Sequence, residues 1–467
     1  MSSHASELAV SGVSRNPSNG ELIKTYPFQS PDEVENTLAT NAAAAKLWRA
    51  TSMEDRVKCY RRLAATLRDR SESLAMLATS EMGKTLKSAR AEVEKCAAAM
   101  EWFAEHGPAI LADEPAPVEG DDQVYVSFLP IGTVLGVMPW NFPFWQAMRA
   151  AGPIMLSGNG FILKHAPNVL GCAYGLQDAF EASGFPKNLF VTLNAGNDVV
   201  GKAIEDPRVA AVTVTGSLRA GSAVASLAGK LAKRSLLELG GADPFIVLAD
   251  ADIDKAVEIG IEARFQNAGQ VCLAAKRFIL ERPIADEFTQ KYVIAAAKIK
   301  AGDPLDPSTN IGPIARGDLR DGVHDQVERS IANGAKLLLG GKKVDGPGFF
   351  YEPTVLGDVK PGMAAFDEEV FGPVAAISVA EDLEDAIRLA NTSEFGLSGN
   401  LWTTDTKKAM EIARRLETGG VFVNGYTASN PRIPVGGVKK SGYGRELSHF
   451  GLREFVNAQG VWVKKLK

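Results

Sequence analysis

The chain has 467 residues, of which 45% are apolar and 23% charged, the balance of a globular protein large enough for two or three structural units. Its 51 Lys and Arg residues against 56 Asp and Glu give a net charge of −5, which argues against nucleic acid or an anionic membrane as a partner. There is no apolar run of about 18 residues to span a bilayer and no secretory signal pattern, so we expect a soluble, cytoplasmic protein.

The cysteines and histidines are scattered. The four cysteines lie far apart without a C-x-x-C pair, and the five histidines form no H-E-x-x-H motif. We therefore expect no disulfide, no bound metal and a reducing compartment.

Residues 32 to 106 are predicted to be helical. The segment is rich in alanine, and leucines recur three, four and seven residues apart within it. Pro108 is predicted to end this helical part, because proline breaks a helix interior.

From residue 124 onward, short apolar runs alternate with helical stretches. Strands are predicted at 124–128, 134–138, 161–164, 189–193, 209–214 and 235–239, with a helix at 168–183. The pattern restarts after Gly241, with strands at 245–248 and 278–280 around a helix at 253–265. This order predicts an α/β protein with two parallel sheets. The tail at 461–463 is predicted to be an edge strand which, with the strand near 124, serves subunit contact.

Cys272 and Glu238 are the candidate reactive pair. Cys272 follows Asn267, Gly269 and Gln270, which are poor core residues and predict a turn at the end of a helix, although a buried cysteine acting as a small apolar residue is equally compatible. Glu238 interrupts an apolar strand just before two glycines. It is either a solvated glutamate of an edge strand or a half-buried general base.

Two turns are candidate binding segments. Asn141, in the rigid Pro139–Pro143 turn, has an amide that could stabilise an oxyanion by about 3 kcal/mol. Thr215-Gly216-Ser217 ends a strand and opens a helix, which suits a phosphate as well as a plain helix cap. The chain lacks G-x-G-x-x-G, and the P-loop-like run before Ala203 lacks the Ser or Thr that holds Mg²⁺.

Together these segments resemble motifs of the aldehyde dehydrogenase family, in the family's order and over nearly the whole chain. Lys164 to Asn168 and Gly437 to Phe450 are similar to short bacterial NAD(P)-dependent succinate-semialdehyde dehydrogenases. The resemblance implies two α/β domains and a small β oligomerisation element. Residues 1–118 and 140–241 would form the dinucleotide-binding domain and 242–430 the catalytic thiol domain. Residues 119–139 and 431–467 would form the oligomerisation element of a homodimer or homotetramer.

The resemblance also implies a role for each matching residue. Cys272 would attack the aldehyde, Asn141 and the Cys272 N–H would hold the oxyanion, and Glu238 would activate water to release the acid from a thioester. The residues expected to bind NADP or NAD are Trp140, Lys164, Gly216, Ser217, Leu239, Glu369 and Phe371. Pro167 stands three residues after Lys164, where many NAD-preferring relatives carry glutamate, so we expect NADP to be accepted or preferred.

Arg149 and Ser429 match positions that contact the substrate carboxylate in succinate-semialdehyde enzymes. Gln266 stands where some of those enzymes have a second arginine. Other ω-semialdehydes and neutral aldehydes stay open as substrates. A CoA-acylating enzyme is an alternative that the presence of Glu238 argues against, and a non-catalytic binding protein on the same fold is another.

Overall fold

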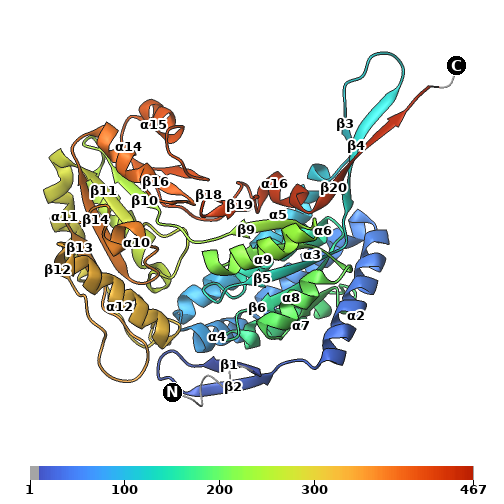
Figure 1. Cartoon of the computed structure of the whole chain (residues 1–467), viewed down its shortest axis with the longest axis horizontal. Coiled ribbons are helices and arrows are strands. Elements are labelled where there is room, and N and C mark those ends of the chain that lie inside the picture. Colours follow the sequence, from blue (N-terminus) through green and yellow to red (C-terminus); the bar gives the residue numbers. More distant parts are fainter. Residues whose placement is uncertain (1–9, 466–467) are drawn as a thin grey trace.

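The computed structural model describes residues 10–465, which form two α/β units joined side by side and a narrow β arm that projects from one of them (Figure 1). The N-terminal unit is built around a six-stranded sheet in the order β19-β9-β8-β5-β6-β7. Its strands are β5 (Thr133–Met138), β6 (Gly160–His165), β7 (Phe190–Thr192), β8 (Val209–Thr215), β9 (Arg234–Glu238) and β19 (Gly442–Tyr443).

Both faces of this sheet are covered, which explains why its strands read as nearly continuous apolar runs. Leu135 and Ile162 point to the face that carries α2 (Pro31–Ala50), α8 (Asn197–Glu205) and α9 (Leu218–Lys230). Val134 and Phe161 alternate to the other face. The helices on that side are α3 (Met53–Asp69), α4 (Ser71–Met82), α5 (Leu86–Ile110), α6 (Trp145–Leu156) and α7 (Leu170–Ala182).

The second unit has a seven-stranded sheet in the order β12-β13-β14-β11-β10-β16-β17, parallel except for β12. Its strands are β10 (Pro244–Val247), β11 (Arg277–Glu281), β12 (Lys336–Leu339), β13 (Thr354–Gly357), β14 (Val374–Ala380), β16 (Gly399–Trp402) and β17 (Val421–Val423). Phe245 and Phe278 pack under α10 (Ile253–Phe265) and α11 (Arg282–Ala296). The opposite face is covered by α12 (Gly317–Ala332), α13 (Ala364–Asp367), α14 (Leu383–Asn391) and α15 (Thr406–Ala413).

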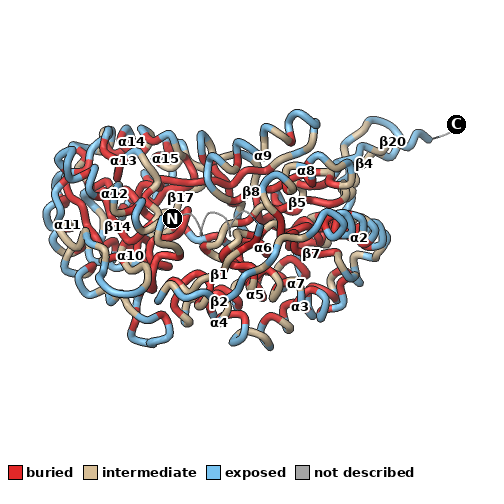
Figure 2. Tube along the Cα trace, turned by 60° about the horizontal axis from the view of Figure 1, so that its bottom comes forward, coloured by how far each residue is buried: buried red, intermediate tan, exposed pale blue. Residues whose placement is uncertain are grey.

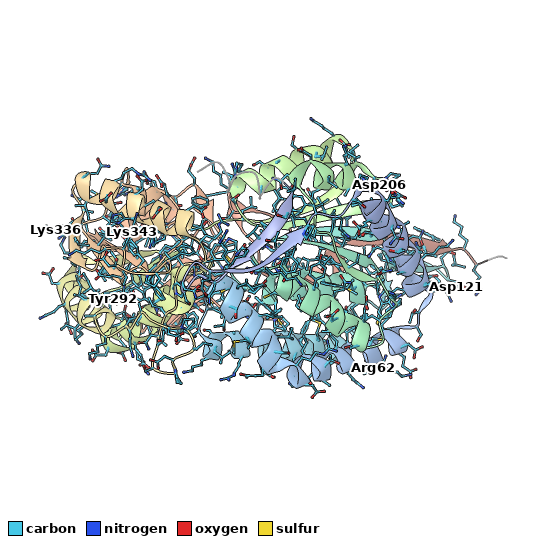
Figure 3. The ribbon with its side chains drawn as sticks, turned by 90° about the horizontal axis from the view of Figure 1, so that it is seen from below. Arg62, Asp121, Asp206, Tyr292, Lys336 and Lys343 are labelled. Atoms are coloured by element: carbon cyan, nitrogen blue, oxygen red, sulfur yellow. The ribbon has the colours of Figure 1, made fainter. Side chains whose placement is uncertain are left out.

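The central strands β5 and β8 are buried, whereas the outer faces of α2 and α11 are exposed (Figure 2). Tyr292 of α11 lies inside the second unit, and Asp121 on the arm lies at the far end of the molecule from Lys336 (Figure 3). Within residues 10–465, none of the helices combines the length and apolar character needed to cross a bilayer.

The arm consists of β3 (Glu114–Pro115), β4 (Gln123–Pro130) and β20 (Val456–Val463) in the order β20-β4-β3. The strand predicted at 461–463 is the end of β20, and it pairs antiparallel with the strand predicted near 124. Two shorter pairs complete the sheets, β1 (Ser11–Arg15) with β2 (Leu22–Pro27) and β15 (Phe395–Gly396) with β18 (Val438–Lys439). The β1–β2 hairpin was not foreseen, because β1 is short and largely polar and β2 is largely exposed.

Three sequence expectations need correction. Helix α5 continues through Pro108 to Ile110, since a proline so close to the helix end removes one hydrogen bond while buried Phe103 and Gly107 hold the helix in place. The oligomerisation boundary at 139 is wrong for β5, which pairs with β6 and β8 at the centre of the first sheet. Likewise β19, expected in the oligomerisation element, pairs with β9.

Candidate active site

Cys272 lies in a strained turn. The short 3₁₀ segment η1 (Gln266–Gly269) follows α10, and Asn267, Ala268 and Gly269 all have positive φ, at 51°, 54° and 74°. Only glycine fits at 269, because a Cβ there would lie 2.1 Å from the carbonyl oxygen of Gly372. The turn that the small residues predicted is therefore present, and backbone strain of this kind gathers at functional sites.

Side chains hold this turn from both ends. The Asn267 amide donates to the Asn141 carbonyl over 2.8 Å. Lys276 Nζ donates to the carbonyl oxygens of Val271 at 2.9 Å and Cys272 at 2.5 Å. The turn is thus fixed by hydrogen bonds that leave the Cys272 side chain free to face a pocket.

Glu238 is the last residue of β9 and is fully buried. It is not a solvated edge residue, because Gly442 of β19 pairs with it from the outer side. The two glycines that follow allow close packing: a Cβ on Gly240 would lie 2.4 Å from Glu369 Oε2, and one on Gly241 would lie 3.1 Å from the Cys272 carbonyl. Glycine at these two positions therefore allows a close approach to Glu369 and to the Cys272 backbone.

The Cys272 thiol lies 4.0 Å from Glu238 Oε2, to which it can donate its proton. Burial, followed by the nearby Glu238 carboxylate, raises the pKa of Cys272, although Arg149 and Lys276 oppose the rise. The thiol is therefore protonated at neutral pH, and within residues 10–465 the Glu238 carboxylate is the one hydrogen-bond acceptor beside it. The thiol and the carboxylate thus meet although 34 residues separate them in the chain.

Arg149, on α6, binds two carboxylates. Its Nη2 donates to Glu238 Oε2 over 2.7 Å, and its Nε pairs with Glu446. Burial opposes the charge on Arg149, but Glu446 and Glu238 outweigh that effect and raise its pKa. Burial also raises the pKa of Glu446 to about 7, against the opposing effect of Arg149.

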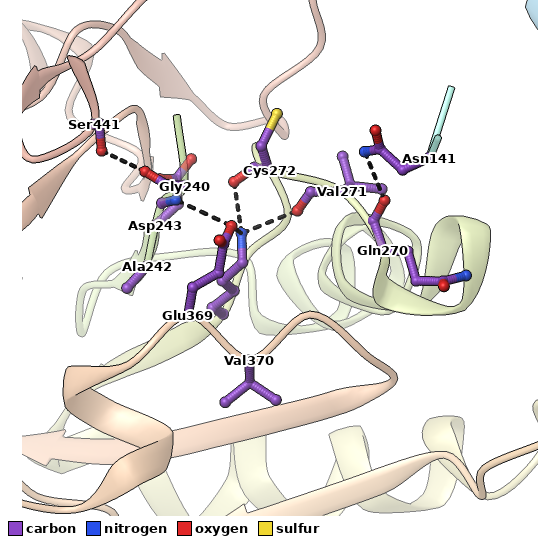
Figure 4. Close-up of polar contacts among 12 residues, drawn as sticks. Asn141, Gly240, Ala242, Asp243, Gln270, Val271, Cys272, Glu369, Val370 and Ser441 are labelled. Carbon is purple, nitrogen blue, oxygen red and sulfur yellow. Dashed lines mark hydrogen bonds and ion pairs between the residues drawn. The ribbon is translucent and has the colours of Figure 1, made fainter. Parts of the chain in front are cut away.

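Asn141 follows β5 and lies beside the thiol loop (Figure 4). Its Nδ2 donates to the Gln270 carbonyl over 3.0 Å, and its Oδ1 has no partner among the described residues. An amide nitrogen carries two N–H groups, so one of them is left for an oxygen in the pocket.

Glu369 lies on the other side of the Cys272 turn, and the sulfur of Cys272 points away from it (Figure 4). Its Oε1 accepts from the Gly241 N–H at 3.1 Å and lies 3.6 Å from Lys276 Nζ. Removal from water raises the pKa of Glu369, while Lys276 counteracts that rise.

The expected cofactor residues follow the carboxyl ends of neighbouring strands. Trp140 follows β5, Lys164 is near the end of β6, and Gly216 and Ser217 follow β8. The sheet order reverses between β5 and β8, and ligands of open α/β sheets bind at such a crevice. Ser217 is the N-cap of α9, as its position after a strand predicted.

Two of the residues expected to bind the cofactor, Trp140 of the first unit and Phe371 of the second, have aromatic rings in contact with each other. Trp140 and Phe371 pack edge to face with ring centroids 5.7 Å apart. Leu239 is buried against Gly221 in the first turn of α9, and its N–H donates to the Ser441 carbonyl. Trp140 and Leu239 thus lie just after the carboxyl ends of β5 and β9.

A pocket of about 120 Å³ opens beside Cys272, and both residues expected to bind substrate line it. The structure does not favour that role for Arg149, because its guanidinium is 1% exposed and already paired with Glu238 and Glu446. Ser429 fits better, since its hydroxyl oxygen accepts from Lys95 Nζ at 2.9 Å and from Trp145 Nε1 at 2.8 Å. Gln266 also lines the pocket.

The profile of the aldehyde dehydrogenase family matches residues 7–461. The chain belongs to this family. It is therefore an oxidoreductase that acts on aldehydes, as the resemblance of its motifs implied. The two parallel-sheet units and the β arm confirm the expected α/β aldehyde dehydrogenase-like fold.

Related aldehyde dehydrogenases match nearly the whole chain. Succinate semialdehyde dehydrogenase [NAD(P)+] Sad of Escherichia coli (strain K12) is 54% identical over 458 residues, which are 98% of this chain and 99% of the relative. Succinate-semialdehyde dehydrogenase [NADP(+)] 1 of Mycobacterium tuberculosis (strain ATCC 25618 / H37Rv) is 45% identical over 96% of this chain and 98% of its own length. The solved succinic semialdehyde dehydrogenase of Streptococcus pyogenes with NADP+ superposes with a TM-score of 0.95 at 34% identity, covering 98% of this chain and 100% of the other.

Several residues of this aldehyde dehydrogenase site were not foreseen. Glu446 pairs with Arg149, and Lys276 donates to the Cys272 carbonyl. Glu446 lies in the segment that resembles the family, but its partner is far away in sequence and Lys276 binds the backbone, so neither residue was assigned a role from the sequence. Lys95 is one of many charged residues in a helical stretch. Only a helical projection of α5 could have indicated that Lys95 faces inward, because on the helix it lies next to the buried Glu92 and Cys96.

Proposed function

We propose that this aldehyde dehydrogenase oxidises succinate semialdehyde, or a similar small ω-semialdehyde, to the carboxylic acid with NADP or NAD. The observation that carries the proposal is the buried Cys272 thiol at 4.0 Å from Glu238, opening into a small pocket that holds two cations and no carboxylate. Such a pocket suits a substrate with an anionic far end. The names of the relatives above point to the same substrate.

Cys272 begins the reaction. Its proton passes to Glu238 as the sulfur forms a bond to the aldehyde carbon, and the carbonyl oxygen becomes an oxyanion. The raised pKa of the thiol means that it needs this neighbouring base. Arg149, held at 2.7 Å, keeps Glu238 oriented for the transfer.

The oxyanion would be held by the second N–H of Asn141 and the backbone N–H of Cys272. The hydrogen bond from Asn141 to Gln270 and that from Asn267 to Asn141 keep the donor fixed before substrate arrives. A donor that needs no reorganisation stabilises charge as it develops.

Glu238 acts a second time in release. Once Glu238 has passed the Cys272 proton on to solvent, it takes a proton from water as the water oxygen bonds to the acyl carbon of the thioester, and the C–S bond then breaks to free the acid and the Cys272 thiolate. A CoA-acylating enzyme has no use for such a base, and a binding protein has no use for the thiol. The Cys272–Glu238 geometry therefore favours the hydrolytic reaction over both alternatives.

The residues present fit a nicotinamide dinucleotide. Lys164 is half-buried, forms no ion pair within residues 10–465, and its ammonium donates only to the His165 carbonyl, so it is available to a ribose or phosphate oxygen. Burial lowers the pKa of Lys164, and a phosphate beside it would favour the charged ammonium. Ser217 would bind the pyrophosphate at the start of α9, Glu369 a ribose hydroxyl, and Phe371 would flank the ring. When bound, the nicotinamide supplies the hydride acceptor that the oxidation requires.

We further propose that NADP is accepted or preferred. With Pro167 in place of a carboxylate, nothing at that position repels a 2′-phosphate beside Lys164. We propose a homodimer or homotetramer that uses the arm, because β20 ends in the exposed Trp462 and Val463. Four free, buried cysteines support a reducing compartment such as the cytoplasm.

The test is a panel of aldehydes with each cofactor, followed by absorbance at 340 nm. We expect kcat/KM for succinate semialdehyde to exceed that for butanal at least tenfold, and Cys272→Ala to be inactive with every aldehyde. Equal rates on both aldehydes would refute the substrate, and a tenfold higher kcat/KM with NAD than with NADP would refute the cofactor preference.

A further inference from the structure

The pocket beside Cys272 has an unusual charge balance. Two of its lining residues are cationic, Lys95 and Arg149, and no Asp or Glu lines it. Arg149 is already engaged in ion pairs with Glu238 and Glu446. Lys95, which comes from α5, forms no ion pair within residues 10–465 and is the available positive charge of the pocket.

Lys95 and its neighbours Ser429 and Trp145 have more hydrogen-bond donors than acceptors. Lys95 Nζ lies 2.9 Å from Ser429 Oγ and 4.4 Å from the centre of the Trp145 ring. Ser429 Oγ accepts this bond and a second one of 2.8 Å from Trp145 Nε1. Both lone pairs of the hydroxyl are thus used, so its own O–H points to a further acceptor. Two N–H groups of Lys95 and the Ser429 O–H remain for a ligand that only accepts hydrogen bonds.

We propose that Lys95, together with Ser429, binds the carboxylate at the far end of the substrate. This inference rests on the proposed function and names the residue that recognises the substrate class. A carboxylate accepts hydrogen bonds through both oxygens. Its negative charge would also give Lys95 the ion-pair partner that it lacks. Gln266, at the pocket position of the second expected arginine, is neutral and supplies no such charge.

The surroundings explain why Lys95 favours an anion. Burial, then the charge on Arg149, lowers the pKa of Lys95 to about 8, and Lys84 adds to this while Cys96 and Glu92 oppose it. Glu92 does not satisfy Lys95, because it pairs with Lys84. A bound carboxylate would offset the cost of keeping this buried ammonium charged.

Three variants test the assignment in the full-length enzyme: Lys95→Met, Lys95→Arg, and the control Lys87→Met at an exposed site on the same helix. The assay compares KM and kcat for succinate semialdehyde and for butanal, a four-carbon aldehyde without the carboxylate. We expect Lys95→Met to raise KM for succinate semialdehyde about 10- to 100-fold, the effect of losing a charged hydrogen bond. It should change kcat and the butanal constants less than twofold. Lys95→Arg should recover most of the loss, and Lys87→Met should match the wild type.

A second assay measures inhibition of butanal oxidation by succinate. We expect Lys95→Met to raise the inhibition constant at least tenfold. An equal loss on both aldehydes, or an unchanged inhibition constant, would overturn the assignment. If the wild type shows no preference for succinate semialdehyde while Lys95→Met still weakens succinate, the proposed substrate fails and Lys95 remains the carboxylate ligand.

Discussion

Replacing Arg149 by methionine separates two roles that the residue could have. The sequence suggested a substrate ligand, for which the loss would fall on succinate semialdehyde and spare a neutral aldehyde. The structure places its Nη2 2.7 Å from Glu238 Oε2, with side chains that are 1% and 0% exposed. We therefore expect Arg149→Met to impair the base and to slow the oxidation of every aldehyde.

The magnitude follows from that contact. A hydrogen bond between charged groups contributes about 1.5–3 kcal/mol, which corresponds to about a 10- to 150-fold loss of kcat/KM. Glu446 adds little further cost, because its pKa of about 7 allows it to take up a proton once its cation is gone. Arg149→Lys, which keeps a charge near Glu238, should lose less than Arg149→Met.

The assay is kcat/KM for succinate semialdehyde and butanal at saturating NADP, with thermal unfolding to confirm that the variant is folded. Losses on the two aldehydes should agree within about threefold. A loss at least tenfold greater for succinate semialdehyde would refute the reasoning, because it would show that Arg149 holds the substrate carboxylate. Lys95→Met, with its opposite pattern, serves as the internal comparison.

Three other outcomes are expected. Pro167→Glu, which restores a carboxylate near Lys164, should raise KM for NADP at least tenfold with little change for NAD, and an equal change for both would contradict the role of this position. Glu92→Ala leaves buried Lys84 and the N–H groups at the start of α6 without a partner. The free energy of unfolding measured in urea should therefore fall by about 3–5 kcal/mol, and a fall below about 1 kcal/mol would be inconsistent with a buried pair. Lys95 is protonated below its pKa of about 8 and loses its charge above it. The ratio of kcat/KM for succinate semialdehyde to kcat/KM for butanal should therefore fall about tenfold per pH unit above pH 8. A ratio that stays constant up to about pH 10 would show that the Lys95 ammonium does not bind the substrate.

The sequence predicted the elements that depend on local pattern. The helix at 253–265 is α10, and the strand at 209–214 is β8 with one added residue, because apolar periodicity and flanking turn residues define such segments. The turn at Asn267 to Gly269 was also foreseen from residue type. The prediction was less accurate for segments whose position depends on tertiary contacts. An example is β5, whose place at the centre of the sheet depends on its pairing with β6 and β8.

The residues of the site that belong to local sequence motifs were predictable. Cys272 and Glu238 were paired from their sequence settings, and the structure brings them together. The role of Arg149 was not predictable, because its partner Glu446 comes from a segment nearly 300 residues later. Lys95 was missed for the same reason, since α5, α6 and the loop with Ser429 form the pocket only after folding.

The dependence of Glu238 on the last part of the chain has a consequence for biosynthesis. Glu446 follows Glu238 by 208 residues, and β19, which covers Glu238, lies just before Glu446. At 5–20 residues per second, the ribosome needs roughly 10 to 40 seconds between making these two carboxylates. The outer strand of the N-terminal sheet and the second partner of Arg149 are therefore made only when synthesis is almost finished, so a chain that ends before β19 leaves Glu238 without its cover.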